Sequence, residues 1–168
     1  MAVNAARPSR PLRIAGPALG VLIAALLAAA VWIGGDLRDA QAAADDRRAA
    51  VQAAGVHAVA LLSVNHHSAD ADLKRVLDTS TGAARVAYAR SLGTLKADAI
   101  KNKALRTGAL RASGIVSLTG NTARVMVVGD MVTRQDGSKK APHEQFSRWN
   151  MEVTRVGGIW LVSKAELV

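Results

Sequence analysis

An uninterrupted apolar segment near the N-terminus constrains this chain more than any other feature. Residues 14–35 contain no charge, and residues 19–33 are entirely apolar apart from Gly20. A helix rises about 1.5 Å per residue, so this segment matches the roughly 30 Å hydrocarbon core of a membrane. Helices of soluble cores usually carry a polar face, which this segment lacks. We therefore predict a transmembrane helix over residues 14–35.

The charges that flank the segment predict its direction. Arg7, Arg10 and Arg13 precede it, whereas Asp36 and Asp39 follow it. Basic flanks remain on the cytoplasmic side of a membrane. We predict single-pass insertion in the cytoplasmic (inner) membrane, with the N-terminus inside and the C-terminal domain outside.

A cleaved signal peptide is the alternative, because Ala40-Gln41-Ala42 has the small-x-small form of a cleavage site. The apolar run is longer than the roughly 7 to 15 residues usual in a signal peptide, and charged residues separate it from that motif. We favour an uncleaved anchor. Both possibilities place the following domain in the same compartment.

Composition narrows what the outer domain can do. The chain has no cysteine, which removes disulfides, thiolate catalysis and cysteine-ligated zinc. Aromatic residues make up 3% of the chain, so its core must consist mainly of aliphatic side chains, and base stacking is not expected. The net charge of +9 favours anionic partners such as lipid headgroups or acidic proteins without choosing among them. We expect no nucleic-acid partner.

Helical periodicity occupies the first half of the outer domain. Val51, Ala58 and Leu62 recur at helical spacing, and residues 36–65 contain no proline. The polar residues 36–50 predict a stalk ahead of the core.

Two further helices are expected after this one. Ser68 is a candidate N-cap, Asp70 and Asp72 suit the first turn, and Gly82 is a candidate stop for the second helix. The third helix should turn four apolar residues inward: Tyr88, Leu92, Leu95 and Ala99.

Beyond residue 105 the pattern alternates, as in strands. A two-residue loop at Gly120-Asn121 predicts a hairpin. Asp130 and Arg134 then lie on the face opposite Val125 and Val127, where we expect them to be solvated, unless the concave pocket of a cone takes one of them. The expected register pairs Leu118 with Ala123, Val116 with Val125, and Gly114 with Val127.

A second hairpin is expected around Gly157-Gly158. Its register pairs Val153 with Val162 and brings Arg155 opposite Trp160, where the guanidinium could lie over the indole. The polar residues 136–142 would join the two hairpins.

These elements predict an α+β fold: an N-terminal transmembrane helix, then helices packed on a curved four-stranded antiparallel sheet. We predict four parts: residues 1–13 as a cytoplasmic basic tail, 14–35 as the membrane helix, 36–50 as a helical stalk and 51–168 as the extracytoplasmic domain.

Catalytic and metal-binding patterns are weak. His66 and His67 are adjacent, so they would point about 100° apart on a helix and to opposite faces on a strand, which is poor geometry for one metal. His57 lies nine residues before His66. We expect structural or solvated roles for these histidines, and no catalytic residue, cofactor or metal.

Two surfaces are candidates for binding. An apolar cone between helices and sheet could hold a lipid acyl chain. A basic patch could dock an acidic partner or a lipid headgroup. The cone lining would comprise Leu73, Leu77, Tyr88, Trp149, Met151, Val153, Trp160 and Val162, and the patch Lys101, Lys103, Arg106 and Arg111.

The order of segments resembles that of the actinobacterial Mce-associated membrane proteins. Besides the basic tail, the single span and the β-meander, the resemblance lies in Leu61-Leu62-Ser63, Ala71-Asp72, Val76-Leu77-Asp78-Thr79-Ser80-Thr81-Gly82 and Gly158-Ile159-Trp160-Leu161-Val162-Ser163.

The resemblance implies a cone of the nuclear transport factor 2-like or cystatin-like kind. It further implies a non-enzymatic accessory subunit that supports a mammalian-cell-entry (Mce) lipid importer, with the lipid bilayer and Mce complex proteins as partners. A lipid-binding module is the alternative. The inner-membrane assembly factor of type IV secretion has the same shape and ranks second among scaffolds, because its Asn-Pro-x-Pro signature cannot occur with prolines only at positions 8, 11, 17 and 142.

Protease accessibility tests the predicted topology. Protease added to cells stripped of their outer envelope should digest the C-terminal domain, because the arginine-flanked end stays in the cytoplasm. Immunoblotting of the C-terminal part measures this. Protection of that part, or recovery of the protein in soluble cytosol, would contradict the prediction.

Overall fold

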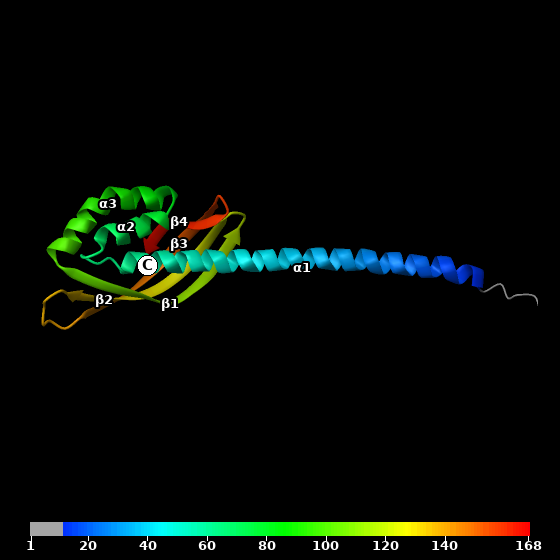
Figure 1. Cartoon of the computed structure of the whole chain (residues 1–168), viewed down its shortest axis with the longest axis horizontal. Coiled ribbons are helices and arrows are strands. Elements are labelled where there is room, and N and C mark those ends of the chain that lie inside the picture. The colour runs from blue at the N-terminus through cyan, green and yellow to red at the C-terminus, as the bar shows by residue number, and fades with distance from the viewer. Residues whose placement is uncertain (1–11) are drawn as a thin grey trace, which may run out of the picture. The chain divides into compact units, whose positions relative to one another are not determined.

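The computed structural model describes residues 12–168, and their side chains from residue 19 onward. The arginines of the predicted basic tail lie outside that side-chain range. The chain divides into two units, Met1–Ala44 and Asp45–Val168. The elements, labelled in Figure 1, are α1 (Leu12–Leu62), α2 (Ala69–Asp78), α3 (Gly82–Lys101), β1 (Ala104–Thr119), β2 (Thr122–Gln135), β3 (His143–Val156) and β4 (Ile159–Leu167).

The first unit contains the apolar part of α1. Its large apolar side chains are 50% to 77% exposed between Leu19 and Ile33. Soluble proteins rarely expose so much contiguous apolar surface to water. This helix is long and apolar enough to cross a membrane, since an 18-residue stretch of it has a mean hydropathy of 2.0, and it thus indicates a single-pass anchor. The predicted span, the stalk and the Ala40-Gln41-Ala42 motif all lie within α1.

In the second unit the four strands form an antiparallel meander in the order β1-β2-β3-β4. Figure 1 shows the strands curving and α2 and α3 together on one side of them. The predicted α+β architecture, helices first and then a four-stranded antiparallel sheet, is confirmed.

Alanines at every fourth position dock α1 on this sheet. Ala50, Ala54 and Ala58 are at most 1% exposed, and Leu62 continues the same stripe. Side chains this small bring the helix backbone close to the strands. The stripe packs in one cluster with core residues of the sheet: Ala123, Val125, Val127, Trp149, Met151, Val153, Trp160 and Val162.

The register of the first hairpin is as predicted only next to its turn. Leu118 pairs with Ala123. Val116 is bulged out, so Ile115 instead of Val116 faces Val125. A bulge inserts one extra residue, and here it lets Ile115 pack against the core while Val116 stays exposed. The predicted Gly114–Val127 pair is wrong for the same reason, since Ser113 faces Val127.

The second hairpin has the predicted pairs Val153–Val162 and Arg155–Trp160. The Arg155 guanidinium, however, binds Asp46 of α1 at 2.9 Å in place of the predicted contact with the indole. An opposite charge on the neighbouring helix is a stronger partner than a ring face.

The ends of α2 differ from prediction. The Ser68 hydroxyl does not cap the helix; it donates to Asp72 Oδ2 at 2.7 Å. The same carboxylate oxygen accepts the Asn65 N–H at 3.0 Å, so buried Asp72 organises the turn before α2. Thr79 terminates α2, whereas Gly82 begins α3 with φ of +51°, a conformation suited to glycine.

Three of the four residues predicted on the inner face of α3 lie there. Ala99 is buried, and Tyr88 and Leu92 are partly buried against the two apolar clusters, but Leu95 is exposed.

Buried His57 connects all three helices. Its Nδ1 lies 2.8 Å from Thr79 Oγ1, and its Nε2 lies 3.2 Å from the Tyr88 hydroxyl. Thr79 uses its single hydroxyl hydrogen on the carbonyl groups of Arg75 and Val76. With that hydrogen on a carbonyl group, His57 Nδ1 donates to Thr79 and Nε2 accepts from Tyr88. Burial lowers the pKa of His57 to about 4 and raises that of Tyr88.

A methyl group at Gly108 should destabilise the domain. A Cβ there would lie 2.2 Å from Leu62 Cβ, so Gly108→Ala should lower the free energy of unfolding by about 1–3 kcal/mol through overpacking. Thermal unfolding of the full-length protein in detergent, followed by circular dichroism, measures this. Gly114→Ala is the control on the same strand, because a Cβ at that position would meet nothing within 4 Å. Equal effects of both variants would refute the close approach.

His57 should make stability depend on pH. Below its ordinary pKa of 6.5 the unfolded chain binds a proton that the folded protein, with a pKa of about 4, does not. The free energy of unfolding should thus fall by roughly 3 kcal/mol from this residue as pH drops from 6.5 to 4, and return above 6.5. Denaturant titrations of wild type and His57→Gln at several pH values measure it. The variant should lose this part of the slope; an unchanged slope would show that other groups cause it.

Candidate functional site

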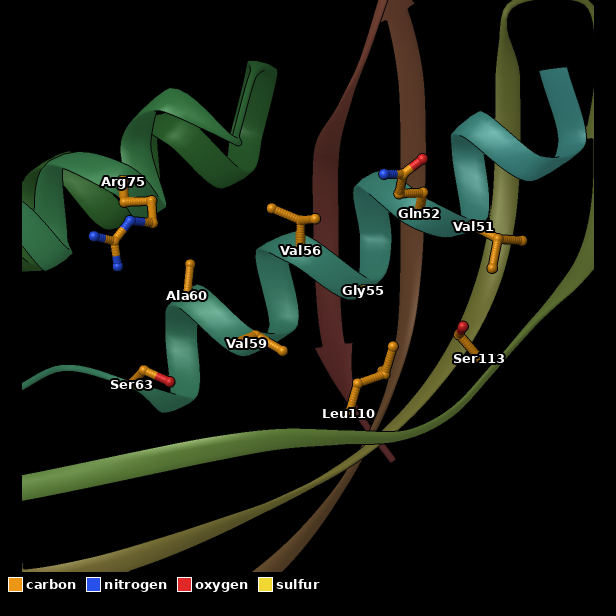
Figure 2. A pocket seen from close by; sticks show the side chains of 10 residues that line it. All are labelled: Val51, Gln52, Gly55, Val56, Val59, Ala60, Ser63, Arg75, Leu110 and Ser113. Atoms are coloured by element: carbon orange, nitrogen blue, oxygen red, sulfur yellow. The ribbon is translucent and has the colours of Figure 1, made fainter. Parts of the chain in front are cut away.

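An open apolar groove lies beside α1 in the second unit, where the helix faces β1. Its volume is about 440 Å³. Figure 2 shows side chains from α1, α2 and β1 around it. The lining comprises Val51, Gln52, Gly55, Val56, Val59, Ala60, Ser63, Arg75, Leu110 and Ser113.

Gly55 and Leu110 make a close contact in the groove. A Cβ on Gly55 would lie 2.9 Å from Leu110 Cδ2, so the glycine lets this leucine rest against the helix backbone in its present conformation. Leu110 nevertheless remains 41% exposed, and Val56 remains 48% exposed on the helix. The groove therefore presents large apolar side chains of a helix and a strand to solvent.

A second hollow adjoins the groove. It has a volume of about 470 Å³, shares Gln52 and Val56 with the first, and extends over β4 to Ile159, which is 65% exposed. Val56 thus stands between two hollows. We name the surface formed by Val56 of α1, Leu110 of β1 and Ile159 of β4 the apolar α1 face, because it borders the exposed side of that helix. Large apolar side chains exposed beside two hollows make this surface a candidate interaction site.

One charge borders the groove. Arg75 of α2 lines it, and its Nη1 lies 3.4 Å from Asp72 Oδ1. The Arg75 side chain is still largely exposed. A ligand could therefore pack an apolar part into the groove and place one anionic group against the Arg75 guanidinium.

The residues predicted to line a cone lie inside the protein. Five of these residues belong to the sheet. They are 0% to 8% exposed in the main core, and Tyr88 packs against them. These residues fill the space between helices and sheet, and Trp160 also borders the second hollow. Leu73 belongs to a separate cluster with Val64 and Ala99, and Leu77 lines a hollow between α2 and α3. The five sheet residues are Trp149, Met151, Val153, Trp160 and Val162.

The predicted basic patch is only partly available. Lys101 at the end of α3 and Lys103 just after it are exposed, while the backbone N–H of Arg106 donates to Asn65 Oδ1 at 2.7 Å and the Arg106 side chain is half-buried. Arg111 pairs with Asp130, whose hydrogen bond and charge raise the pKa of the guanidinium. Asp130 is 7% exposed, so its predicted solvated position is wrong. Arg111 lies at a bulge of β1, and its guanidinium pairs with Asp130 of β2.

The prediction that His66 and His67 diverge is also wrong. They lie in the turn between α1 and α2, where the helix and strand geometries do not apply. Both Nε2 atoms approach Asp136 Oδ2, at 3.2 and 3.3 Å. The spacing of residues in the sequence could not predict this cluster, because Asp136 is 69 positions after His67.

The apolar α1 face was missed from sequence, although a signal existed. Val56 lies two residues, or about 200°, from Ala54 around the helix, on the side opposite the buried alanines. A helix with apolar residues on two opposite sides has one more apolar side than its own sheet can cover.

Solved structures share the fold of the second unit. The periplasmic domain of DotI superposes with a TM-score of 0.57 and 18% identity, over 70% of this chain and 91% of that domain. An IcmL-like type IV secretion system protein from Legionella pneumophila has a TM-score of 0.59 and 12% identity, over 70% and 88% of the two chains. At these identities the likeness concerns the fold.

The sequence also has a curated relative and a matching family model. Uncharacterized protein Rv1363c of Mycobacterium tuberculosis (strain ATCC 25618 / H37Rv) is 30% identical over 125 residues, which are 73% of this chain and 47% of that protein. The chain therefore spans about half the length of this relative. The family model described as "Uncharacterized protein Rv1363c/MT1408-like" matches residues 13–168. This chain belongs to the Rv1363c/MT1408-like family.

Proposed function

We propose that this chain is a membrane-anchored, non-enzymatic accessory subunit that assembles a transport complex in the cell envelope. The apolar α1 face is its docking surface for an apolar segment of a partner protein. The observation that carries this proposal is the exposure of Val56, Leu110 and Ile159 on a well-packed helix and sheet.

The anchor supports an assembly role. A domain tethered to the membrane meets other membrane proteins in one plane, which raises its effective concentration for them. Arginines before the span and aspartates after it favour a cytoplasmic N-terminus, with the second unit outside the cytoplasmic membrane. The fold is shared with a periplasmic domain, which agrees with that location.

The Mce-type lipid importer is the complex we propose. The motifs Leu61-Leu62-Ser63 and Gly158-Ile159-Trp160 support it through their resemblance to Mce-associated proteins. A type IV secretion-like complex is the alternative, supported by the fold shared with a type IV secretion system protein. The prolines of this chain do not form that family's signature, so we rank the importer first.

Occupied polar groups support a non-enzymatic role. His57 is buried, neutral at pH 7 and bonded at both ring nitrogens, so it has no free atom for a substrate. Asp72 is likewise engaged with Asn65 and Ser68, and Asp130 pairs with Arg111 through Oδ2. A general acid or base needs a group within reach of its substrate.

Lipid binding is the second candidate, favoured by the position of Arg75 at the groove. An acyl chain along the apolar wall could place an anionic headgroup at this guanidinium.

Site-specific crosslinking tests the docking surface. A photoreactive phenylalanine analogue at position 56, in the full-length protein in its native membrane, should crosslink to Mce permease or Mce subunits. Val56→Glu should reduce co-purification of those subunits at least tenfold, because a carboxylate would be desolvated in the contact. Quantitative mass spectrometry after detergent extraction measures both.

Val86→Glu is the matched control, since Val86 is 50% exposed on α3 and lines neither hollow. It should leave co-purification unchanged. Crosslinks to secretion subunits would select the alternative complex. Retention of lipid without any partner, lost in Val56→Glu, would select the lipid-binding candidate. Equal co-purification with all variants would refute the docking surface.

A further inference from the structure

We propose that His66, His67 and Asp136 form a binding site for a divalent transition-metal ion such as Zn²⁺. This inference is independent of the proposed docking role, because the cluster shares no residue with the apolar α1 face.

Three donor atoms converge at this place. The ligand atoms of the two imidazoles and the carboxylate all lie within 4.8 Å of one another. His66 Nε2 is 3.2 Å and His67 Nε2 is 3.3 Å from the same carboxylate oxygen, Asp136 Oδ2. Ligands about 2.0–2.2 Å from a tetrahedral zinc ion stand roughly 3.4 Å apart, so these spacings suit adjacent corners of one coordination sphere.

An unpartnered atom favours a metal over a simple hydrogen bond. His66 Nε2 is buried and has no hydrogen-bond partner, although the carboxylate is nearby. Leaving such an atom unsatisfied costs about 1–3 kcal/mol. A metal ion would use its lone pair without requiring a hydrogen directed at Asp136.

The backbone holds both halves of the site in place. The His66 N–H donates to the Ala104 carbonyl at 2.9 Å, and the Asp136 N–H donates to the Lys103 carbonyl at 2.9 Å. Both halves are therefore tied to the connection between α3 and β1. The two rings are 3.8 Å apart, centre to centre. A prearranged set of ligands lowers the cost of ordering them on binding.

The ligand types select the class of metal. Two imidazoles and one carboxylate suit Zn²⁺, Co²⁺, Ni²⁺ or Cu²⁺, whereas Mg²⁺ and Ca²⁺ prefer oxygen ligands. His67 is exposed and Asp136 is more than a third exposed, so an ion has access from solvent. Three protein ligands leave a fourth position for water or a group from a partner. A bound ion would join the α1–α2 turn to the β2–β3 connection.

Metal binding is best measured on full-length protein in detergent without a polyhistidine tag. Calorimetric titration with Zn²⁺ should give one site per chain, and Co²⁺ should produce the visible absorption of tetrahedral nitrogen and oxygen ligation. His67→Ala and Asp136→Asn should each weaken Zn²⁺ binding more than ~10-fold, because even supporting residues around metal ligands matter to that extent. Zn²⁺ should also raise the thermal midpoint of wild type.

His143→Ala is the matched control. His143 is an exposed histidine at the start of β3 and lies outside the cluster. Its substitution should leave affinity and the Co²⁺ spectrum unchanged. The circular dichroism spectra of all variants should match wild type, since both substituted ligands lie in turns. Absence of Zn²⁺ binding by wild type, or equal affinity of wild type, His67→Ala and Asp136→Asn, would overturn the proposal.

Discussion

The close contact between α1 and the sheet is the constraint on which the second unit depends. Ala50, Ala54 and Ala58 repeat at the spacing that keeps one helix face on the strands, and their small side chains let the backbone approach. Gly108 continues this approach at the end of the helix, where even a methyl group would meet Leu62. Larger residues at these positions would lift α1 and open the core below it.

This contact also produces the candidate docking surface. A helix that lies deep on the sheet exposes its opposite side between two walls, one from β1 and one from β4. Val56 lies on that exposed side and lines both hollows. The same helix therefore covers the core with one side and separates the two hollows with the other. The buried network of His57, Thr79 and Tyr88 holds α2 and α3 against α1. A rigid scaffold of this kind loses little freedom when a partner binds.

The polar groups divide into those used for folding and those left available. Buried Asp72 satisfies the Asn65 N–H and the Ser68 hydroxyl, and buried Asp130 pairs with Arg111 through Oδ2, although its Oδ1 has no partner in the part of the chain that the structure describes. His66 and His67 differ, because one has an unpartnered nitrogen and the other faces solvent beside Asp136. Function on a common fold comes from such groups and not from the architecture itself.

Local features of the sequence determined the membrane helix, the order of elements and the strand pairing near each turn. A long apolar segment without charge fits a membrane, and a two-residue loop sets the register of the strands that leave it, as the pairs Leu118–Ala123 and Val153–Val162 show. Only the tertiary structure decided the bulge at Val116, the burial of Asp130, the packing that fills the predicted cone and the meeting of His66 with Asp136. These features depend on contacts between distant segments, whose packing and charge pairing override local periodicity.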